Sequence, residues 1–397
     1  MEKQYKRIGT EYYKVVYYPL QSGDKMKTLA PWKKGEIITD EGKDFIQTIP
    51  KYDGFCLIPS HTDYKYEIEG FYNRYELLEH TFKEGDFPIT KKYLKHIFGE
   101  QYELGIDYIT ILWHMPTQVL PILCLVSKER NTGKTTFLDW LKLIFQNNMT
   151  LNKNEDFRSK FNSDWASKLI IAVDEVLLDR KEDSERLKNL STAKSYKSEA
   201  KGKDKVEGNF FGKFILNSNN EENFVYIDDQ EIRYWVRKID PIPKEEENPD
   251  LIKLLKKELP MFMDFINTRS ITSRKRSRMW FTKEQIHTLA LDVLMKGNKT
   301  YVSRELEQIL MDEFDKFETE ELKYSVGDLV EKLAKNNIRV SSFKISEVLK
   351  KQYGMESSNS TYTKYHLAIS PITNKSMIEE LGYKGRHFTF TKDMFEK

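Results

Sequence analysis

The sequence predicts an α/β protein built around a parallel β-sheet. Three segments, Leu120–Val126, Lys168–Val176 and Gly212–Asn220, contain the continuous apolar runs expected of strands that are buried on both faces. The first is followed by Thr135–Phe145, whose apolar residues have helical spacing. Alternation of strand and helix is typical of a parallel sheet covered by helices.

Composition divides the chain into four predicted regions. The first is rich in Tyr, Gly, Asp and Pro and predicts a small mixed α/β region whose role the sequence does not indicate. The second holds the α/β core, and the third is helical, with an amphipathic helix over Thr282–Gly297. The fourth has the order helix, turn, helix, two strands, which predicts a winged-helix-like domain or a generic small α+β module. The predicted regions are residues 1–100, 101–245, 246–300 and 301–397.

Composition also excludes several protein classes. Of the 397 residues, 39% are hydrophobic and 32% are charged, which indicates a globular protein with a heavily charged surface. The sequence has neither an apolar run of about 18 residues nor the apolar core of a signal peptide, so we expect a cytoplasmic protein without a membrane partner. Two cysteines, Cys56 and Cys124, allow no disulfide framework, and seven scattered histidines have no metal-binding spacing.

Two local runs of basic residues stand out against a net charge of only +2. The segment Ala193–Lys205 has five lysines, and Arg269–Arg278 has five basic residues and no acidic one. Each run predicts either a nucleic-acid-binding patch or a solvated loop.

The segment KERNTGKTT, at Lys128–Thr136, ends like a phosphate-binding P-loop. Gly133, Lys134 and Thr135 stand in the order that this motif requires, but Lys128 stands where the motif has its first glycine. In such a loop, backbone N–H groups and the N-terminus of the following helix surround phosphate oxygens. The alternative is an accidental Gly-Lys-Thr triplet in a surface turn. The residues expected to bind phosphate are Asn131, Thr132, Gly133, Lys134, Thr135 and Thr136.

Two acidic residues end the second predicted strand. Ligands of open α/β sheets bind beyond the carboxyl ends of the strands, where Asp174 and Glu175 are expected. Lys134 would reach the β- and γ-phosphates, and the Thr135 hydroxyl and Asp174 would hold Mg²⁺. Glu175 would polarise the attacking water. An ordinary exposed acidic pair is the alternative interpretation.

Two further polar groups complete the predicted catalytic set. The third strand ends in asparagines, and Asn219, or less favourably Asn217, could orient water against the γ-phosphate. The alternative is an asparagine-rich turn. Arg233 or Arg237 could stabilise charge on a phosphate at a subunit interface, or could simply pair with nearby acids.

Together these segments resemble the superfamily 3 helicases of the AAA+ class, particularly the primase-helicase-like proteins of phages, plasmids and other bacterial mobile elements. The resemblance covers residues 120–240 and rests on the P-loop, the acidic strand and the asparagine strand within the compact span Lys128–Asn219. It implies an AAA+ P-loop ATPase core with ATP and Mg²⁺ as cofactors. It also implies a homo-oligomeric ring, which we expect to be a hexamer.

The resemblance further implies a basic hairpin that tracks single-stranded DNA inside the ring, and an arginine that acts across the subunit interface. Arg233 matches the arginine best by position. The implied function is an ATP-dependent DNA helicase or translocase in phage or mobile-element replication, acting on single-stranded or fork DNA, with priming left to a separate protein. A P-loop switch ATPase and a non-enzymatic winged-helix DNA-binding initiator remain open. The expected hairpin lysines are Lys197, Lys201, Lys203 and Lys205.

Overall fold

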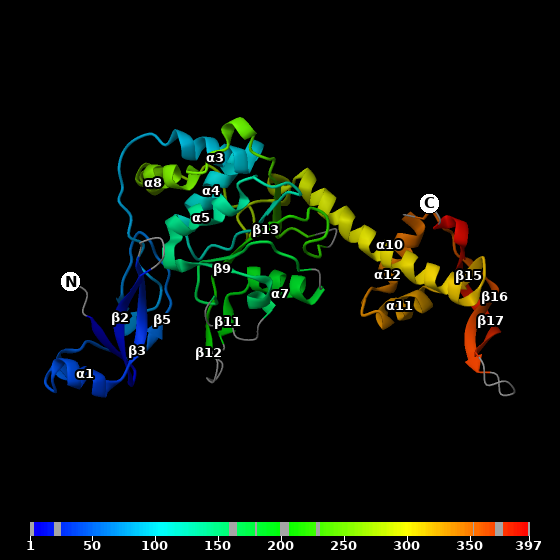
Figure 1. The fold of residues 1–397 in the computed structure, drawn as a ribbon, viewed down its shortest axis with the longest axis horizontal. Helices are drawn as coiled ribbons and strands as arrows, with labels where there is room; N and C mark the ends of the chain where they lie inside the picture. Colours follow the sequence, from blue (N-terminus) through cyan, green and yellow to red (C-terminus); the bar gives the residue numbers. More distant parts are fainter. Residues whose placement is uncertain are drawn as a thin grey trace. The chain divides into compact units, whose positions relative to one another are not determined.

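The chain packs as two compact units, Met1–Val293 and Leu294–Lys397, and each is described by itself (Figure 1). The four predicted regions are finer than this division and stay predictions. In the described part of the chain, no helix combines the length and the apolar character needed to cross a membrane. The computed structural model describes residues 4–19, 25–158, 165–178, 181–198, 206–227, 231–351, 353–369 and 376–395.

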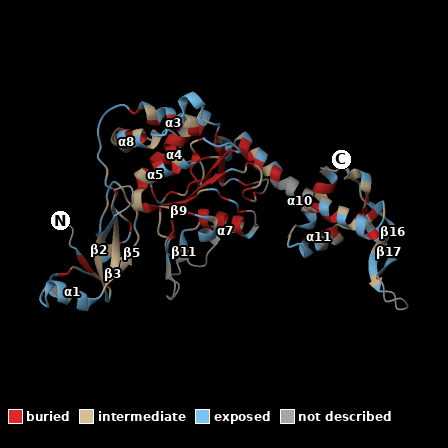
Figure 2. Cartoon of the chain, in the orientation of Figure 1, coloured by how far each residue is buried: buried red, intermediate tan, exposed pale blue. Residues whose placement is uncertain are grey.

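A five-stranded sheet forms the centre of the first unit, with strand order β14-β8-β13-β10-β9 and parallel pairing throughout. The predicted α/β fold with a parallel sheet is therefore confirmed. The three predicted apolar segments form β8, β10 and β13, whose residues are all buried (Figure 2). The strands are β8 (Ile122–Val126), β9 (Met149–Asn152), β10 (Ile170–Val173), β13 (Lys213–Ser218) and β14 (Tyr234–Lys238).

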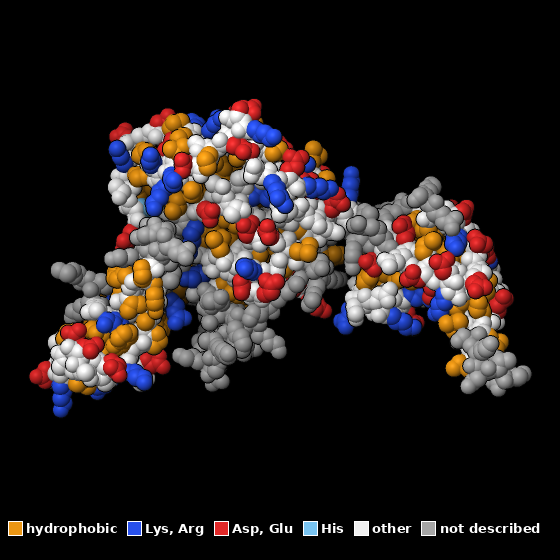
Figure 3. All heavy atoms as spheres, in the orientation of Figure 1, with side chains coloured by type: hydrophobic (Ala, Val, Ile, Leu, Met, Phe, Trp, Pro, Cys, Tyr) orange, Lys and Arg blue, Asp and Glu red, His pale blue; other side chains and the backbone are white. Residues whose placement is uncertain are grey.

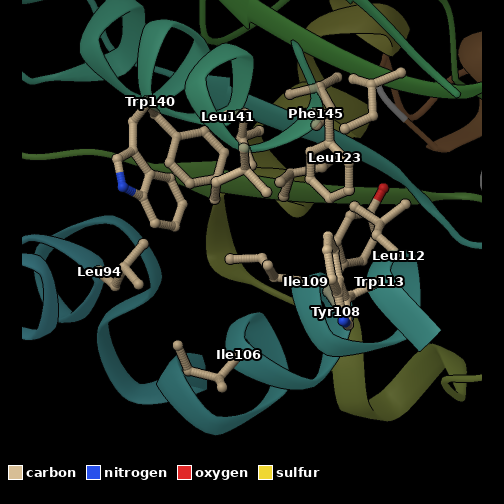
Figure 4. Packing of buried hydrophobic residues seen from close by; sticks show 14 of the residues in the cluster. Leu94, Ile106, Tyr108, Ile109, Leu112, Trp113, Leu123, Trp140, Leu141 and Phe145 are labelled. Carbon is tan, nitrogen blue, oxygen red and sulfur yellow. The ribbon is translucent and has the colours of Figure 1, made fainter. Parts of the chain in front are cut away.

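Helices lie on both sides of this sheet. Figure 1 shows α3 (Pro88–Phe98), α4 (Tyr102–His114), α5 (Lys134–Phe145) and α8 (Leu251–Thr268) on one side and α7 (Lys181–Ser191) on the other. The apolar faces of α3, α4, α5 and α8 meet the sheet in one large cluster (Figure 4). Truncating one such large side chain to alanine lowers the free energy of unfolding by about 3–5 kcal/mol, so this cluster holds the sheet and its covering helices in place. It includes Leu94, Tyr108, Leu123, Trp140 and Phe145.

The N-terminal part of this unit is the mixed region that the sequence predicts. It contains a four-stranded sheet of order β3-β2-β1-β4 and a three-stranded sheet of order β5-β7-β6. Hydrophobic side chains gather on its surface (Figure 3), and Tyr17, Tyr18 and Phe71 are among the exposed ones. The elements are β1 (Tyr5–Ile8), β2 (Glu11–Pro19), β3 (Lys25–Trp32), α1 (Lys34–Glu41), α2 (Phe45–Thr48), β4 (Lys51–Tyr52), β5 (Phe55–Cys56), β6 (Glu67–Ile68) and β7 (Phe71–Asn73).

The amphipathic segment Thr282–Gly297 is broken into two helices, where the sequence predicts one. The side chains of Thr282 and Gln285 form a capping box that starts the short α9 (Lys283–Ile286). The Thr288 hydroxyl then accepts a hydrogen bond from the backbone N–H of Leu291 and so starts α10 (Leu289–Phe317). A side-chain hydroxyl can bond the backbone in place of the helical hydrogen bond and so start a new helix. Hydrophobic periodicity gives no signal for such a break.

The second unit has its own core, formed by residues that include Leu310, Leu329, Ile345 and Phe390. The predicted order of helix, helix and two strands is present, preceded by a short strand, β15, that was not predicted. The three strands form an antiparallel sheet of order β15-β17-β16. The winged-helix assignment stays a prediction. The elements that follow α10 are β15 (Glu321–Tyr324), α11 (Val326–Lys335), α12 (Ser342–Lys351), β16 (Ser358–Ile369) and β17 (Ser376–Thr391).

Candidate functional site

A pocket of about 270 Å³ opens where β8, β10 and β13 end. Because these strands are parallel, their carboxyl ends meet at one edge of the sheet. The pocket gathers the six predicted loop residues, both predicted acids and both asparagines, and its other lining residues are Glu129, Arg130 and Ser218. Of the residues predicted for catalysis, Arg233 is absent from this lining. The lining residues are Glu129, Arg130, Asn131, Thr132, Gly133, Lys134, Thr135, Thr136, Asp174, Glu175, Asn217, Ser218 and Asn219.

The loop between β8 and α5 has a backbone conformation that limits which residues it can contain. Gly133 has φ +85°, and a Cβ atom there would lie 3.2 Å from the ring atom Cε2 of Tyr93. Asn131 has φ +55°, a left-handed value that asparagine tolerates better than most residues. The Tyr93 hydroxyl donates to the Gly133 carbonyl at 2.7 Å, and His96 Nε2 lies 3.0 Å from the Thr132 carbonyl. Helix α3 therefore holds the loop in shape from behind.

The loop also presents backbone donors that no acceptor in the described part of the chain uses. Over residues 130–136, the backbone N–H groups form no hydrogen bond within the described ranges. The first bond of α5 runs from the Phe137 N–H to the Gly133 carbonyl at 2.9 Å, so the preceding donors remain at the helix N-terminus. Unused N–H groups and the positive end of the helix dipole together favour a bound anion such as phosphate.

Lys134 adds a positive charge to this position. Its side chain is almost buried, and its Nζ lies 3.3 Å from the Ser127 carbonyl and 3.1 Å from the Thr132 hydroxyl. Within the parts that the structure describes, Lys134 forms no ion pair. Burial lowers the pKa of Lys134, and the carboxylates of Asp174 and Glu221 oppose that shift. An ammonium group held only by neutral oxygens is suited to a negatively charged ligand.

A hydroxyl and a carboxylate meet beside Lys134. The Thr135 Oγ1 atom donates to Asp174 Oδ2 at 3.1 Å, and the Asn217 amide donates to Asp174 Oδ1 at 3.2 Å. The Asn217 Oδ1 atom is buried and has no hydrogen-bond partner. Hydroxyl and carboxylate oxygens are the ligands that Mg²⁺ prefers, usually one or two from the protein and the rest from phosphate and water. Among the described residues, no group of three or more His, Cys, Asp or Glu side chains is placed to hold a metal ion, and a Mg²⁺ bound here would take its remaining ligands from phosphate and water.

Glu175 is exposed at the rim and has a strained backbone, with φ +54°. Its carbonyl accepts from the Asn154 amide at 3.3 Å, and Asn154 Oδ1 accepts from the Leu177 N–H at 3.1 Å. Asn154, which sequence reasoning missed, therefore fixes the turn that presents Glu175. A non-glycine residue with positive φ in a pocket is a common feature of functional sites.

Lys128 does not line the pocket, although it occupies the first glycine position of the motif. Its backbone N–H donates to Glu221 Oε1 at 2.9 Å, and its ammonium group bonds Glu222 Oε1 at 2.6 Å. Glu221 is buried and also pairs with Lys238 at 3.3 Å. Sequence reasoning missed Glu221, because its contact with the loop spans 93 positions and has no local signal.

The two candidate arginines lie elsewhere. The Arg233 carbonyl accepts from the Ile122 N–H at 2.7 Å, which places Arg233 at the amino ends of β8 and β14, opposite the pocket. Its guanidinium group binds both carboxylate oxygens of Glu231, at 2.8 and 3.0 Å. Arg237 is buried and bonds Glu100 at 2.5 Å. Both arginines thus pair with nearby acids, and action across a subunit interface stays a prediction.

The predicted basic hairpin is partly described. Strands β11 (Ser195–Ser198) and β12 (Val206–Asn209) pair in antiparallel fashion, with Lys197 opposite Glu207. The Tyr196 ring packs against Trp165 and Phe210, with ring centroids 5.8 and 5.7 Å away, which fixes the base of the hairpin. The remaining expected lysines, Lys201, Lys203 and Lys205, lie outside the described residues.

Comparisons with known proteins agree with this fold. A family model described as "Family of unknown function (DUF5906)" matches residues 125–235, which include the pocket. A search of curated proteins finds no match. The apo structure of the NrS-1 C-terminal region (305–718) is similar, with a TM-score of 0.60, 16% identity, and coverage of 95% of this chain and 95% of that chain.

Two A-form apo structures of the NrS-1 C-terminal region are similar as well. One has a TM-score of 0.57 and 19% identity, covering 86% of this chain and 80% of that chain. The other has a TM-score of 0.58 and 18% identity, covering 90% and 84%. At these identities, the similarity shows that the chain shares a fold with the NrS-1 C-terminal region.

Proposed function

We propose that this chain is a Mg²⁺-dependent ATP hydrolase of the superfamily 3 helicase type, which moves along DNA during replication of a phage or mobile element. The proposal rests on one observation. The side chains expected to bind phosphate and Mg²⁺ and to activate water all line the same pocket, and they are Lys134, Thr135, Asp174 and Glu175. The resemblance to AAA+ helicases supplies the motor function. The similarity to the NrS-1 C-terminal region supports the fold alone.

Each group in the pocket has a chemical task in this proposal. The free N–H groups of residues 130–136 and the Lys134 ammonium would hold the phosphates. Thr135 and Asp174 would hold Mg²⁺, which supplies charge neutralisation on the phosphate oxygens when bound. Glu175, exposed at the rim, would accept a proton from the attacking water, and Asn219 would orient that water.

The motor function needs parts outside the pocket. The proposal places ATP between the subunits of a ring, with a hexamer as the expected assembly and Arg233 acting on the neighbouring site. The basic hairpin would contact the phosphates of single-stranded or fork DNA, which gives salt-sensitive and largely sequence-independent binding. Priming would come from a separate replication protein.

Hydrolysis of ATP by the full chain, with and without single-stranded DNA, tests the proposal. We expect DNA to stimulate turnover, and both Lys134→Ala and Glu175→Gln to abolish it. Lys91→Ala, at an exposed position on α3, is the control and should behave as wild type. ATP hydrolysis at the same rate with and without DNA would instead indicate a switch ATPase. DNA binding without any turnover would indicate a non-enzymatic initiator.

A second variant tests the hairpin. Lys201→Ala combined with Lys203→Ala should lower stimulation by DNA while ATP binding stays intact. The double variant Lys91→Ala with Lys92→Ala removes the same charge from α3 and serves as the control. Unchanged DNA dependence would remove these lysines from the proposed DNA path.

A further inference from the structure

The basic run Arg269–Arg278 has no part in the proposed function. It follows α8, and the structure divides its five basic residues into two kinds. The side chain of Arg269 is 9% exposed and belongs to a buried network. The others are exposed at the surface, and no acidic residue lies between Asp264 and Glu284 to neutralise them. The exposed residues are Arg274, Lys275, Arg276 and Arg278.

Asp107, which is completely buried on α4, holds the start of this segment. Its carboxylate accepts hydrogen bonds from the Arg269 guanidinium, from the Thr272 N–H at 3.1 Å and hydroxyl at 2.9 Å, and from the Ser273 N–H at 2.6 Å. Arg269 also bonds Glu103 at 3.1 Å. A buried carboxylate with this many donors fixes the backbone that it binds.

The end of the segment is fixed as well. The Trp280 indole donates to the Ser273 hydroxyl at 2.9 Å, and the Arg276 N–H donates to the Trp280 carbonyl at 2.8 Å. The Gln118 amide donates to the Arg278 carbonyl at 2.8 Å. The backbone of residues 272–280 is thus held at both ends.

The four exposed basic side chains of this rigid loop have no partner among the described residues. No hydrogen bond or ion pair joins Arg274, Lys275, Arg276 or Arg278 through its side chain to another described residue. Surface arginines and lysines commonly find a carboxylate, and several lysines of this chain do, among them Lys92 and Lys253. Four adjacent cations on a fixed backbone therefore form a concentrated positive surface, which we call the basic loop.

The basic loop lies at the edge of the sheet opposite the pocket. Gln118, which holds Arg278, comes four positions before β8 begins, and β12 leads into the amino end of β13. Strands β8 and β13 are neighbours in the sheet. Neighbouring strands are about 4.8 Å apart, so the basic loop and the base of the β11–β12 hairpin share one edge.

We propose that Arg274, Lys275, Arg276 and Arg278 form a second DNA-binding surface, which contacts the phosphate backbone without reading the base sequence. Guanidinium groups match phosphate oxygens in a two-pronged geometry, and the lysine adds a further positive charge. A membrane surface would require apolar anchors, and the one large apolar residue among residues 269–278, Ile271, is half-buried. The inference does not depend on ATP hydrolysis.

Binding of fluorescent oligo(dT) to the full chain without nucleotide tests the proposal. The variant replaces all four basic-loop residues by glutamine. We expect binding to weaken roughly tenfold to a hundredfold at 0.1 M salt, and the slope of log K against log[salt] to shrink by about 0.7 for each lost contact. The matched control also removes four charges, by replacing Lys91, Lys92, Lys256 and Lys257 by glutamine. It should leave the DNA affinity and the salt slope near the wild-type values.

Two further measurements complete the test. Replacing Arg274, Arg276 and Arg278 by lysine retains the charge and should retain the salt slope, which separates phosphate binding from a structural role. Vesicles that contain phosphatidylserine provide the other polyanionic surface. The proposal is overturned if the glutamine variant binds DNA with the affinity and slope of the control, or if it loses only vesicle binding. A lack of ATP turnover in the wild type would contradict the proposed function and leave this inference intact.

Discussion

The Thr135 hydroxyl oxygen lies 3.1 Å from a carboxylate oxygen of Asp174, although 39 positions separate the two residues in the sequence. Thr135 is in the first turn of α5, and Asp174 directly follows β10. Strand β13 lies between β8 and β10 in the sheet, and the amide of Asn217 near its carboxyl end donates to the other carboxylate oxygen of Asp174 at 3.2 Å. The sheet order thereby aims three polar side chains at one position beside Lys134.

This contact predicts a dependence on Mg²⁺. Thr135→Ala removes one expected ligand and should raise the Mg²⁺ concentration needed for half-maximal ATP hydrolysis by roughly tenfold, since one hard oxygen ligand is lost. Thr135→Ser retains the hydroxyl and should respond to Mg²⁺ as wild type does. The measurement is a Mg²⁺ titration of turnover at saturating ATP. Equal Mg²⁺ dependence of the alanine and serine variants would remove Thr135 from the metal site.

Gly133 should tolerate no side chain. In Gly133→Ala, a Cβ atom at φ +85° would approach the Tyr93 ring to 3.2 Å, so the loop must shift away from its phosphate-binding shape. We expect a loss of stability of about 1–2 kcal/mol and a large loss of ATP affinity. Gly35→Ala is the control, because Gly35 lies in α1 and a Cβ there meets nothing within 4 Å. Thermal unfolding and binding of a fluorescent ATP analogue measure both effects.

Lys128 should be replaceable, whereas Glu221 should not. Lys128→Gly removes an exposed side chain and leaves its backbone N–H to bond Glu221, so ATP affinity should change less than twofold. Glu221→Ala removes the acceptor that holds the loop and leaves the Lys238 ion pair broken. We expect this loss to weaken ATP binding by about 1–3 kcal/mol, which raises the Kd for ATP roughly fivefold to 150-fold. Glu222→Ala, which removes only the exposed partner of Lys128, is the control. Weaker binding by Lys128→Gly than by Glu221→Ala would reverse this order.

The sheet and the pocket residues could be predicted because their signals are local. Continuous apolar runs mark β8, β10 and β13 as doubly buried strands, and polar residues directly after such strands must meet at one edge. Gly133 could be predicted from its place before Lys134 and Thr135 in the motif. The structure adds the physical cause, which is the positive φ and the adjacent Tyr93 ring.

The supporting contacts could not be predicted, because they join distant parts of the chain. His96 and Tyr93 hold the loop from α3, and Asn154 holds the Glu175 turn, yet none of them carries a motif. The same limit applies to Arg269, which looks in the sequence like one more basic residue of its run. Only its contact with buried Asp107 separates it from the exposed arginines.

Asp107 should be essential for stability at neutral pH. Burial by itself raises the pKa of Asp107, but hydrogen bonds from Arg269 and Ser273 outweigh it and hold the pKa below its usual value. The stabilisation is therefore fully present above the unfolded pKa of about 3.9 and is lost only as pH falls through the folded pKa. Asp107→Asn removes the buried charge partner of Arg269, leaves only the exposed Glu103, and should lower the free energy of unfolding by about 3–5 kcal/mol.

Thermal unfolding of Asp107→Asn at pH 7 and pH 5 measures this effect. The loss of stability should be equal at the two values, because both lie above the titration of Asp107. Asp312→Asn, at an exposed position, should have no effect. A loss that disappears at pH 5 would contradict the assigned direction of the pKa shift.

His61 should make stability pH-dependent in the range where Asp107 does not. Its ring packs against Trp113 and Tyr75, with Nδ1 2.9 Å from the Trp113 carbonyl and Nε2 2.6 Å from the Tyr75 hydroxyl. Burial lowers the pKa of His61 to about 4, while the hydrogen bond to Trp113 opposes the shift and the nearby His80, His114 and Lys213 add to it. His61 is therefore protonated near pH 6.5 in the unfolded chain but only at lower pH in the folded chain.

Stability should therefore fall as pH decreases from about 6.5 to 4, by about 3 kcal/mol over the whole range, because each pH unit contributes about 1.4 kcal/mol. Burial also lowers the pKa of His80, so His80 adds to the slope in the same direction. His61→Gln removes the titrating group and should flatten the fall in melting temperature between pH 7 and pH 5. His287→Gln, whose side chain is 45% exposed, is the control and should retain the wild-type slope. If His61→Gln loses stability equally at both pH values, His61 contributes packing alone, and the pH dependence must come from the other histidines around Trp113.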